Sequence, residues 1–139
     1  MTNTPFRPVL RSQSDVHAMW RSIISPLGWH SRRLYAVVID DHDRPLPTLH
    51  ELDELPARLG RDDATGALSL LADDAPGHRV ALLYCRPGAG QTLDRNDRTA
   101  ARLLYDAARR LRLPLEVIHV ATDTAIVPAP LDEVVALVS

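Results

Sequence analysis

Lysine is missing from this sequence: all 16 basic residues among its 139 are arginine. Without lysine there is no Schiff-base nucleophile, no phosphate-binding loop ending in Lys-Ser/Thr and no kinase-type strand lysine. One cysteine excludes an internal disulfide. No apolar run approaches the ~18 residues that span a bilayer, and the first residues lack the apolar core of a signal peptide. We therefore expect a cytoplasmic protein without membrane contact.

The net charge and the aromatic content are also low. The formal net charge is −2, the sequence pI is about 6.3 and aromatic residues make up 4% of the chain. This balance argues against a general polyanion binder, whose affinity comes from summed contacts to phosphate groups. A chain of this length has room for one core. We expect a single domain over residues 10–139, after a disordered or loosely packed segment over residues 1–9.

Apolar spacing predicts the elements of the first half. A polar turn at 40–44 joins two extended runs, which predicts a β-hairpin. The Asp and His residues of this turn are interpreted as turn formers rather than metal ligands. His17 lies off the apolar stripe of the first helix, and we expect it in solvent. The predicted elements are a helix with Ser14 as N-cap that stops at 25–28, strands at 34–39 and 45–52, and a helical segment at 55–75, interrupted at 60–66 and stopped at 76–77.

The second half contains the clearest patterns. Residues 79–85 form a continuous apolar run, typical of a strand covered on both faces. A long amphipathic helix follows, from 94–97 to Leu113, and then strands at 115–121 and 125–127 and a helix at 131–138. Strand, helix, strand implies a right-handed crossover with parallel strands. We predict an α/β protein with a mixed, α+β type sheet, flanking helices and one βαβ crossover.

The loop after the 79–85 strand is the candidate site, because ligands in α/β sheets bind beyond the carboxyl ends of parallel strands. Residues 85–97 and 122–123 occupy these positions. Gly88 and Gly90 suit either a phosphate cradle or a simple turn, and their spacing fits neither nucleotide-binding fingerprint.

This loop carries a resemblance to the RadC-like branch of the JAB/MPN (JAMM) superfamily of zinc proteases. Their central strand ends in His-x-His-Pro, followed by a loop, a serine and an aspartate that begins a long helix. Laid on this motif without a gap, Tyr84 and Arg86 stand at the two metal histidines, Pro87 at the proline, Asp94 at the serine and Asp97 at the last metal ligand. The resemblance covers roughly residues 10 to 135, including the hairpin and the closing strands, where His119 matches a family histidine. It implies a JAB/MPN-like mixed sheet.

The departures from the motif argue against catalysis. Zinc requires imidazole, thiolate or carboxylate ligands, and tyrosine and arginine do not supply them. A permanent guanidinium at Arg86 repels a divalent cation. Where the family has an acidic general base, this sequence has Arg32 and Arg33. We expect no metal and no cofactor, and we expect Arg86 and Asp97 to form an ion pair across the family's metal position.

Two further groups of residues were weighed as sites. Cys85 and His119 end predicted parallel neighbours and can form a thiol nucleophile with its base, but a buried structural cysteine is the favoured interpretation. An arginine stripe on the long helix can contact nucleic acid, although we favour a solvated face, with Asp106 pairing Arg102. The stripe consists of Arg95, Arg98, Arg102 and Arg109.

Two functions remain open from the sequence. The first is a catalytically inactive RadC/JAB-like domain that acts as an interaction or scaffold module, with a protein partner or a second copy. The second is a metal-independent hydrolase or a nucleotide- or nucleic-acid-binding protein that uses the same loop. In the second, Arg86 clamps an anion and Asp97 or His119 acts as acid or base.

Overall fold

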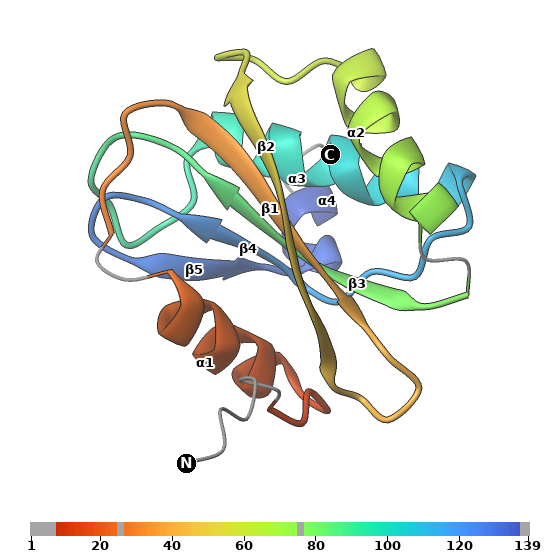
Figure 1. Ribbon diagram of the computed structural model, residues 1–139. Coiled ribbons are helices and arrows are strands. Elements are labelled where there is room, and N and C mark those ends of the chain that lie inside the picture. Colours follow the sequence, from red (N-terminus) through yellow and green to blue (C-terminus); the bar gives the residue numbers. More distant parts are fainter. Residues whose placement is uncertain (1–7, 25–26, 75–76, 137–139) are drawn as a thin grey trace.

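The computed structural model describes residues 8–24, 27–74 and 77–136. A five-stranded mixed sheet, in the order β2-β1-β3-β4-β5, has α1 on one face and α2, α3 and α4 on the other (Figure 1). The predicted fold class is therefore confirmed. The elements are α1 (Gln13–Ile23), β1 (Arg32–Ile39), β2 (Pro45–Leu55), α2 (Arg61–Asp74), β3 (Arg79–Cys85), α3 (Arg95–Arg110), β4 (Ile118–Ala121), β5 (Ile126–Ala129) and α4 (Leu131–Ala136).

The strand pairings confirm the hairpin and the crossover. β1 pairs antiparallel with β2 on one side and with β3 on the other. β3 and β4 are parallel and joined through α3, with Leu83 opposite His119 and Cys85 opposite Ala121. β5 closes the sheet antiparallel to β4. The carboxyl ends of β3 and β4 thus lie side by side, as the crossover requires.

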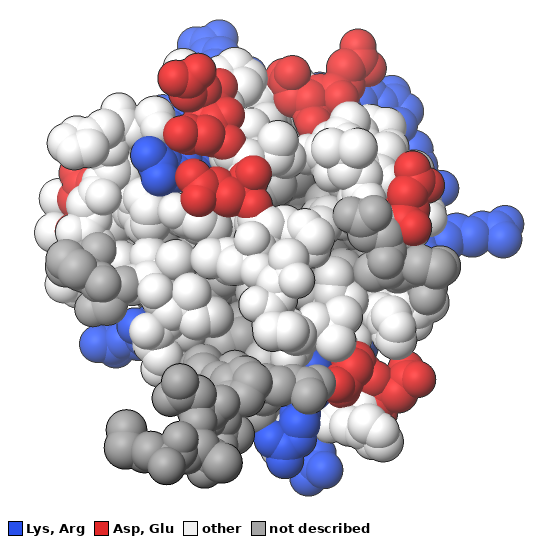
Figure 2. All heavy atoms as spheres, in the orientation of Figure 1, with Lys and Arg blue, Asp and Glu red and all other residues white. Residues whose placement is uncertain are grey.

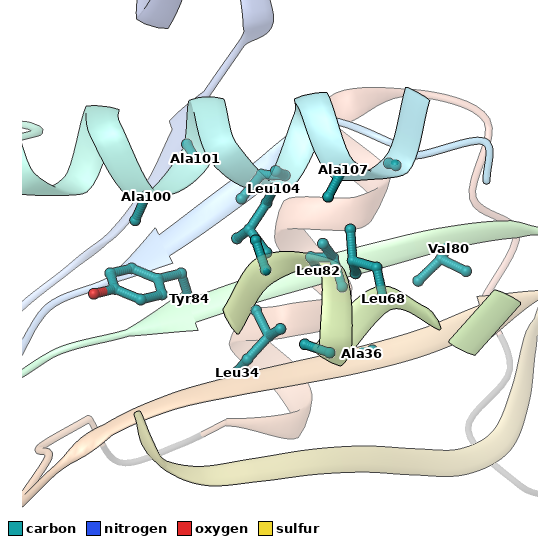
Figure 3. Close-up of a cluster of buried hydrophobic side chains, with 14 of the residues drawn as sticks. Leu34, Ala36, Leu68, Val80, Leu82, Tyr84, Ala100, Ala101, Leu104 and Ala107 are labelled. Atoms are coloured by element: carbon teal, nitrogen blue, oxygen red, sulfur yellow. The ribbon is translucent and has the colours of Figure 1, made fainter. Parts of the chain in front are cut away.

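β3 is buried on both faces, as its continuous apolar run predicted. Val80, Leu82 and Tyr84 face α2 and α3, whereas the alternate residues Leu83 and Cys85 face α1. Figure 3 shows the first of these faces, with Leu82 and Leu68 below the α3 side chains. Because successive strand residues point to opposite faces, a site built on Tyr84 and Arg86 lies on the α3 side, away from Cys85.

The first helix begins two residues earlier than predicted. Ser12, not Ser14, is the N-cap, and it forms a capping box with Asp15. The apolar face of α1 packs on the sheet through Val16, Met19 and Trp20. The N-cap position was misjudged because either serine can precede the same apolar stripe. Of the segment predicted to be loosely packed, residues 1–7 lie outside the described residues, and Leu10 is fully buried.

The predicted helical segment at 55–75 is partly wrong. β2 continues to Leu55, and residues 56–60 form a loop. α2 begins at Arg61 and continues to Asp74 without the predicted interruption. The β1–β2 register shifts between Arg32 and Leu34, and Glu54 adopts a positive φ of 55°. Leu55 ends the strand and Leu59 lies in the loop, so the four-residue spacing of these two leucines, which predicted a helix, spans the end of β2. Part of the predicted stop at 76–77 lies outside the described residues.

The remaining elements match the prediction, with ends that differ by a few residues. β1 begins at Arg32 rather than at 34, and β5 covers Ile126–Ala129 rather than 125–127. α3 ends at Arg110 rather than Leu113, and β4 begins at Ile118, although Leu115 bridges Val80. The last predicted helix, 131–138, is observed to Ala136, and residues 137–139 lie outside the described part of the chain. Within the described residues, every helix is too short or too polar to cross a membrane.

Candidate functional site

The loop between β3 and α3 is anchored at both ends by backbone interactions. The Arg86 amide donates to the Ala121 carbonyl at 3.0 Å, which extends the parallel pairing of β3 and β4 by one residue. At the other end Asp94 is the N-cap of α3, and Asp94 and Asp97 form a capping box. Asp97 is completely buried in the first turn of the helix. The loop therefore presents Arg86 directly to Asp97.

Arg86 and Asp97 form the expected ion pair in bidentate geometry. Arg86 Nε donates to Asp97 Oδ1 at 2.8 Å, and Arg86 Nη2 donates to Asp97 Oδ2 at 2.9 Å. Nη1 donates to the carbonyls of Pro87 and Gly88, and Nη2 also lies 3.6 Å from Asp94 Oδ2. The hydrogen bond that Arg86 donates to Asp97 raises the pKa of Arg86 above its ordinary value, so the guanidinium stays charged. Each guanidinium nitrogen is engaged inside the protein, and Arg86 as a whole is 7% exposed.

Tyr84 fills the other metal-histidine position of the resembling family. Its ring lies under α3 beside Ala100, with the hydroxyl pointing away from the apolar cluster (Figure 3). Arg32 Nη1 donates to the Tyr84 hydroxyl at 3.0 Å. Burial raises the pKa of Tyr84, and the charges of Asp97 and Asp94 add to the shift, whereas Arg32 opposes it. Tyr84 is therefore a neutral, buried phenol beside the ion pair.

The loops at the carboxyl ends of β3 and β4 bind each other, where a ligand was expected. Gly88 N donates to Asp123 Oδ2 at 2.8 Å, and Asp123 N donates to the Gly88 carbonyl at 3.0 Å. Gly90 N donates to Thr124 Oγ1, and Thr122 Oγ1 donates to the Gly90 carbonyl. Since the amides of both glycines are occupied, they do not form a phosphate cradle. Gly88, with φ of 101°, serves the turn.

The residues present do not fit a zinc ion. In the described part of the chain, no group of three or more His, Cys, Asp or Glu side chains is placed to hold a metal. Arg86 and Tyr84 are not zinc ligands at neutral pH, and Asp97 is already bound by Arg86. The hairpin turn has a structural role as well, because Asp40 Oδ1 accepts from the amides of His42 and Arg44.

Cys85 and His119 lie on the opposite, α1 face of the sheet. Cys85 is buried, its nearest hydrogen-bond contact is the Leu83 carbonyl at 3.9 Å, and burial raises the pKa of its thiol strongly. His119 Nδ1 contacts the Val117 carbonyl, and no hydrogen bond joins it to Cys85 among the described residues. Because its pKa is raised and no base is hydrogen-bonded to it in the described structure, the Cys85 thiol is not an activated nucleophile. Neither residue converges with Arg86 and Asp97.

His17 is half-buried, which corrects the expectation of a solvated residue. Its Nε2 lies 2.9 Å from the Ile126 carbonyl of β5, and its ring centroid lies 5.4 Å from that of His119. Burial, with a further contribution from His17, lowers the pKa of His119 to about 4. The off-stripe position of His17 did not predict this contact, because β5 lies against the flank of α1 rather than under its apolar face.

The arginine stripe occupies the outer side of α3. Asp106 pairs with Arg109 at 3.3 Å and with Arg110 at 3.4 Å, and not with Arg102 as expected. Acidic residues gather elsewhere, at the end of β2 and the start of α2, as Figure 2 shows for that side of the molecule. They include Glu51, Asp53, Glu54, Asp62 and Asp63. Part of this acidic group is balanced, because Arg33 pairs with Glu51 at 3.3 Å and with Asp53 at 3.1 Å.

Two contacts of the site were not predicted from the sequence. The Arg32–Tyr84 bond joins residues 52 positions apart, and the Asp123–Gly88 bonds join residues 35 positions apart. An aspartate two residues after the end of β4 was the available signal for the second contact. When the sequence is compared with protein-family models and with curated proteins, no family model and no curated protein matches it.

Proposed function

We propose that this protein is a metal-free member of the RadC-like branch of the JAB/MPN superfamily that works as a protein-interaction module in the cytoplasm. Its partner is another protein or a second copy of the chain. The proposal rests on the ungapped motif from Tyr84 to Asp97, together with the loss of both metal histidines.

One observation carries the proposal: the bidentate pair of Arg86 and Asp97. The carboxylate that would be the last metal ligand is bound at 2.8 and 2.9 Å by a permanent cation. A buried guanidinium with every nitrogen engaged excludes a divalent ion from the same place by charge and by space. The pair ties the loop to α3, and so provides the structural link that a metal provides elsewhere.

The enzyme alternative loses support from the same geometry. Four of the five N–H donors of Arg86 are hydrogen-bonded inside the protein, and Nη2 also lies 3.6 Å from Asp94 Oδ2. Asp97 is completely buried. His119 lies across the sheet from both, on the α1 side. A general acid or base must reach the proton that it transfers, and neither candidate is positioned to do so.

The zinc content of the purified protein tests this proposal. The chain is incubated with zinc sulfate, desalted and analysed by inductively coupled plasma mass spectrometry, with a known zinc enzyme as the assay control. We expect zinc far below one atom per chain. Stoichiometric zinc that is lost in Asp97→Asn would overturn the proposal.

A further inference from the structure

The outer side of α3 carries an arginine stripe without enough acid to balance it. At 100° per residue, Arg95, Arg98, Arg102 and Arg109 fall within an arc of about 60° and extend over about 21 Å of helix. Among the described residues, Arg95, Arg98 and Arg102 form no ion pair. Asp106 pairs with Arg109 and Arg110 instead. This stripe is therefore a linear, cationic surface open to a charged partner.

A hollow of about 460 Å³ lies beside the second half of the stripe, between α3 and α4. Three charged residues, Arg102, Asp106 and Arg109, line it, and Leu103, Tyr105 and Leu131 supply apolar lining. Leu131 is 51% exposed, although it is a large apolar residue. The Tyr105 hydroxyl is occupied, since it donates to the Ala129 carbonyl and accepts from Ile118 N. The hollow thus combines apolar contact with a net positive charge, because its two arginines outnumber the single aspartate.

We propose that this surface, which we call the arginine groove, docks an acidic amphipathic helix of another protein. The inference rests on the proposed function and names the chemistry of the partner. Carboxylates along one edge of such a helix match Arg95, Arg98 and Arg102, and leucine-like side chains on the adjacent edge cover Leu103 and Leu131. The groove follows α3 and reaches Leu131 at the start of α4.

Charge and apolar surface together distinguish this partner from nucleic acid. A phosphate backbone would use the arginines but leave Leu131 uncovered, and nothing in the described stripe offers an exposed aromatic platform for bases. A second copy would have to bring its acidic end of β2 onto α3. That contact joins different surfaces of the two copies and does not close into a symmetric dimer.

A designed helix is the probe for this groove. The peptide has about 16 residues, long enough to follow the stripe, with glutamates on one edge, leucines on the next and alanines elsewhere. It carries a fluorescent label, and binding is followed by anisotropy with the full chain. A scrambled peptide of the same composition and a single-stranded DNA of similar length are the comparison ligands.

Three variants locate the binding. Arg102→Glu reverses charge at the rim, and Leu131→Ser removes apolar contact; both positions are exposed, so the fold is expected to persist. Arg21→Glu is the matched control, with the same charge change on α1 across the sheet. We expect saturable binding of the designed helix that falls about tenfold in Arg102→Glu, falls in Leu131→Ser, and is unchanged in Arg21→Glu. The scrambled peptide is expected to bind more weakly.

Four results would overturn the inference: no saturable binding of the designed helix, equal loss in Arg21→Glu, DNA binding that depends on Arg102 but not on Leu131, or a self-association in ultracentrifugation that Arg102→Glu abolishes. The zinc measurement is independent of these results. Stoichiometric zinc would remove the metal-free assignment and leave the groove standing, whereas a metal-free chain that ignores the peptide would remove the groove alone.

Discussion

The guanidinium of Arg86 and the carboxylate of Asp97 lie side by side, joined by two hydrogen bonds of 2.8 and 2.9 Å in the interior of the protein. One residue follows β3 and the other lies in the first turn of α3, so the pair fixes where the helix starts relative to the sheet. Asp97 Oδ2 also accepts from the Asp94 amide. The carboxylate thereby serves the cap and the ion pair together.

Histidines at the two motif positions are expected to create a zinc site. In the double variant Tyr84→His/Arg86→His, the two new imidazoles and the Asp97 carboxylate supply three zinc ligands. Water can take the fourth position of a tetrahedral site. At a zinc concentration 100-fold above Kd, the bound ion would stabilise the folded state by about 2.7 kcal/mol. Thermal unfolding with and without zinc measures this gain, with wild type as the control. A folded double variant that gains no stability from zinc would show that the motif is out of register.

Acid is expected to destabilise the protein through His119. Burial, aided by His17, lowers the folded-state pKa of His119 from 6.5 to about 4. As pH falls from 6.5 towards 4, the unfolded chain takes up a proton that the folded chain does not, so stability falls by about 3 kcal/mol across this window. Above pH 6.5 the histidine contributes no pH dependence.

Urea unfolding at pH 7 and at pH 4.5 measures the His119 effect. In His119→Gln, the loss of stability between the two pH values should shrink relative to wild type. His42→Gln, with its exposed side chain in the hairpin turn, is the control and should keep the wild-type loss. The same loss in wild type and His119→Gln would assign the acid sensitivity to carboxylates instead.

Cys85 is expected to resist alkylation in the folded protein. Its side chain is fully buried, so an alkylating reagent does not reach the sulfur. Burial also raises the pKa of the thiol, so the reactive thiolate does not form at neutral pH. Intact-mass analysis after iodoacetamide treatment should show unmodified protein, and complete labelling in denaturant. Thr48→Cys, at an exposed position of β2, is the positive control. Rapid native labelling at Cys85 would revive the thiol hypothesis.

The elements with long, strong patterns were predictable. β3 and α3 follow from a continuous apolar run and from an amphipathic helix of 16 residues, and the crossover rule then makes β3 and β4 parallel. The Arg86–Asp97 pair followed from the motif laid on this frame. These predictions depend on local sequence and on one handedness rule, and so they needed no knowledge of distant contacts.

Other parts depended on tertiary register. Whether Cys85 meets His119 is decided by strand pairing, because a slip of one residue exchanges the faces of a strand. The pairing sets Cys85 opposite Ala121 instead. The end of β2 was predicted as helix because Leu55 in the strand and Leu59 in the following loop have helical spacing. The hydrogen bond from Gly88 to Asp123, which closes the β3–α3 loop, joins segments far apart in the chain.

The central claim is that Arg86 and Asp97 act as one structural unit, and a double-mutant cycle measures it most directly. Urea unfolding is followed for wild type, Arg86→Met, Asp97→Asn and the double variant; Arg109→Met and Asp106→Asn give the cycle for an exposed pair, expected to couple by less than about 1 kcal/mol. Each single change should cost about 3–5 kcal/mol, since it leaves a buried group unpaired. We predict that the double variant loses less than the sum by about 1–3 kcal/mol. Losses that add to within about 0.5 kcal/mol would contradict the account.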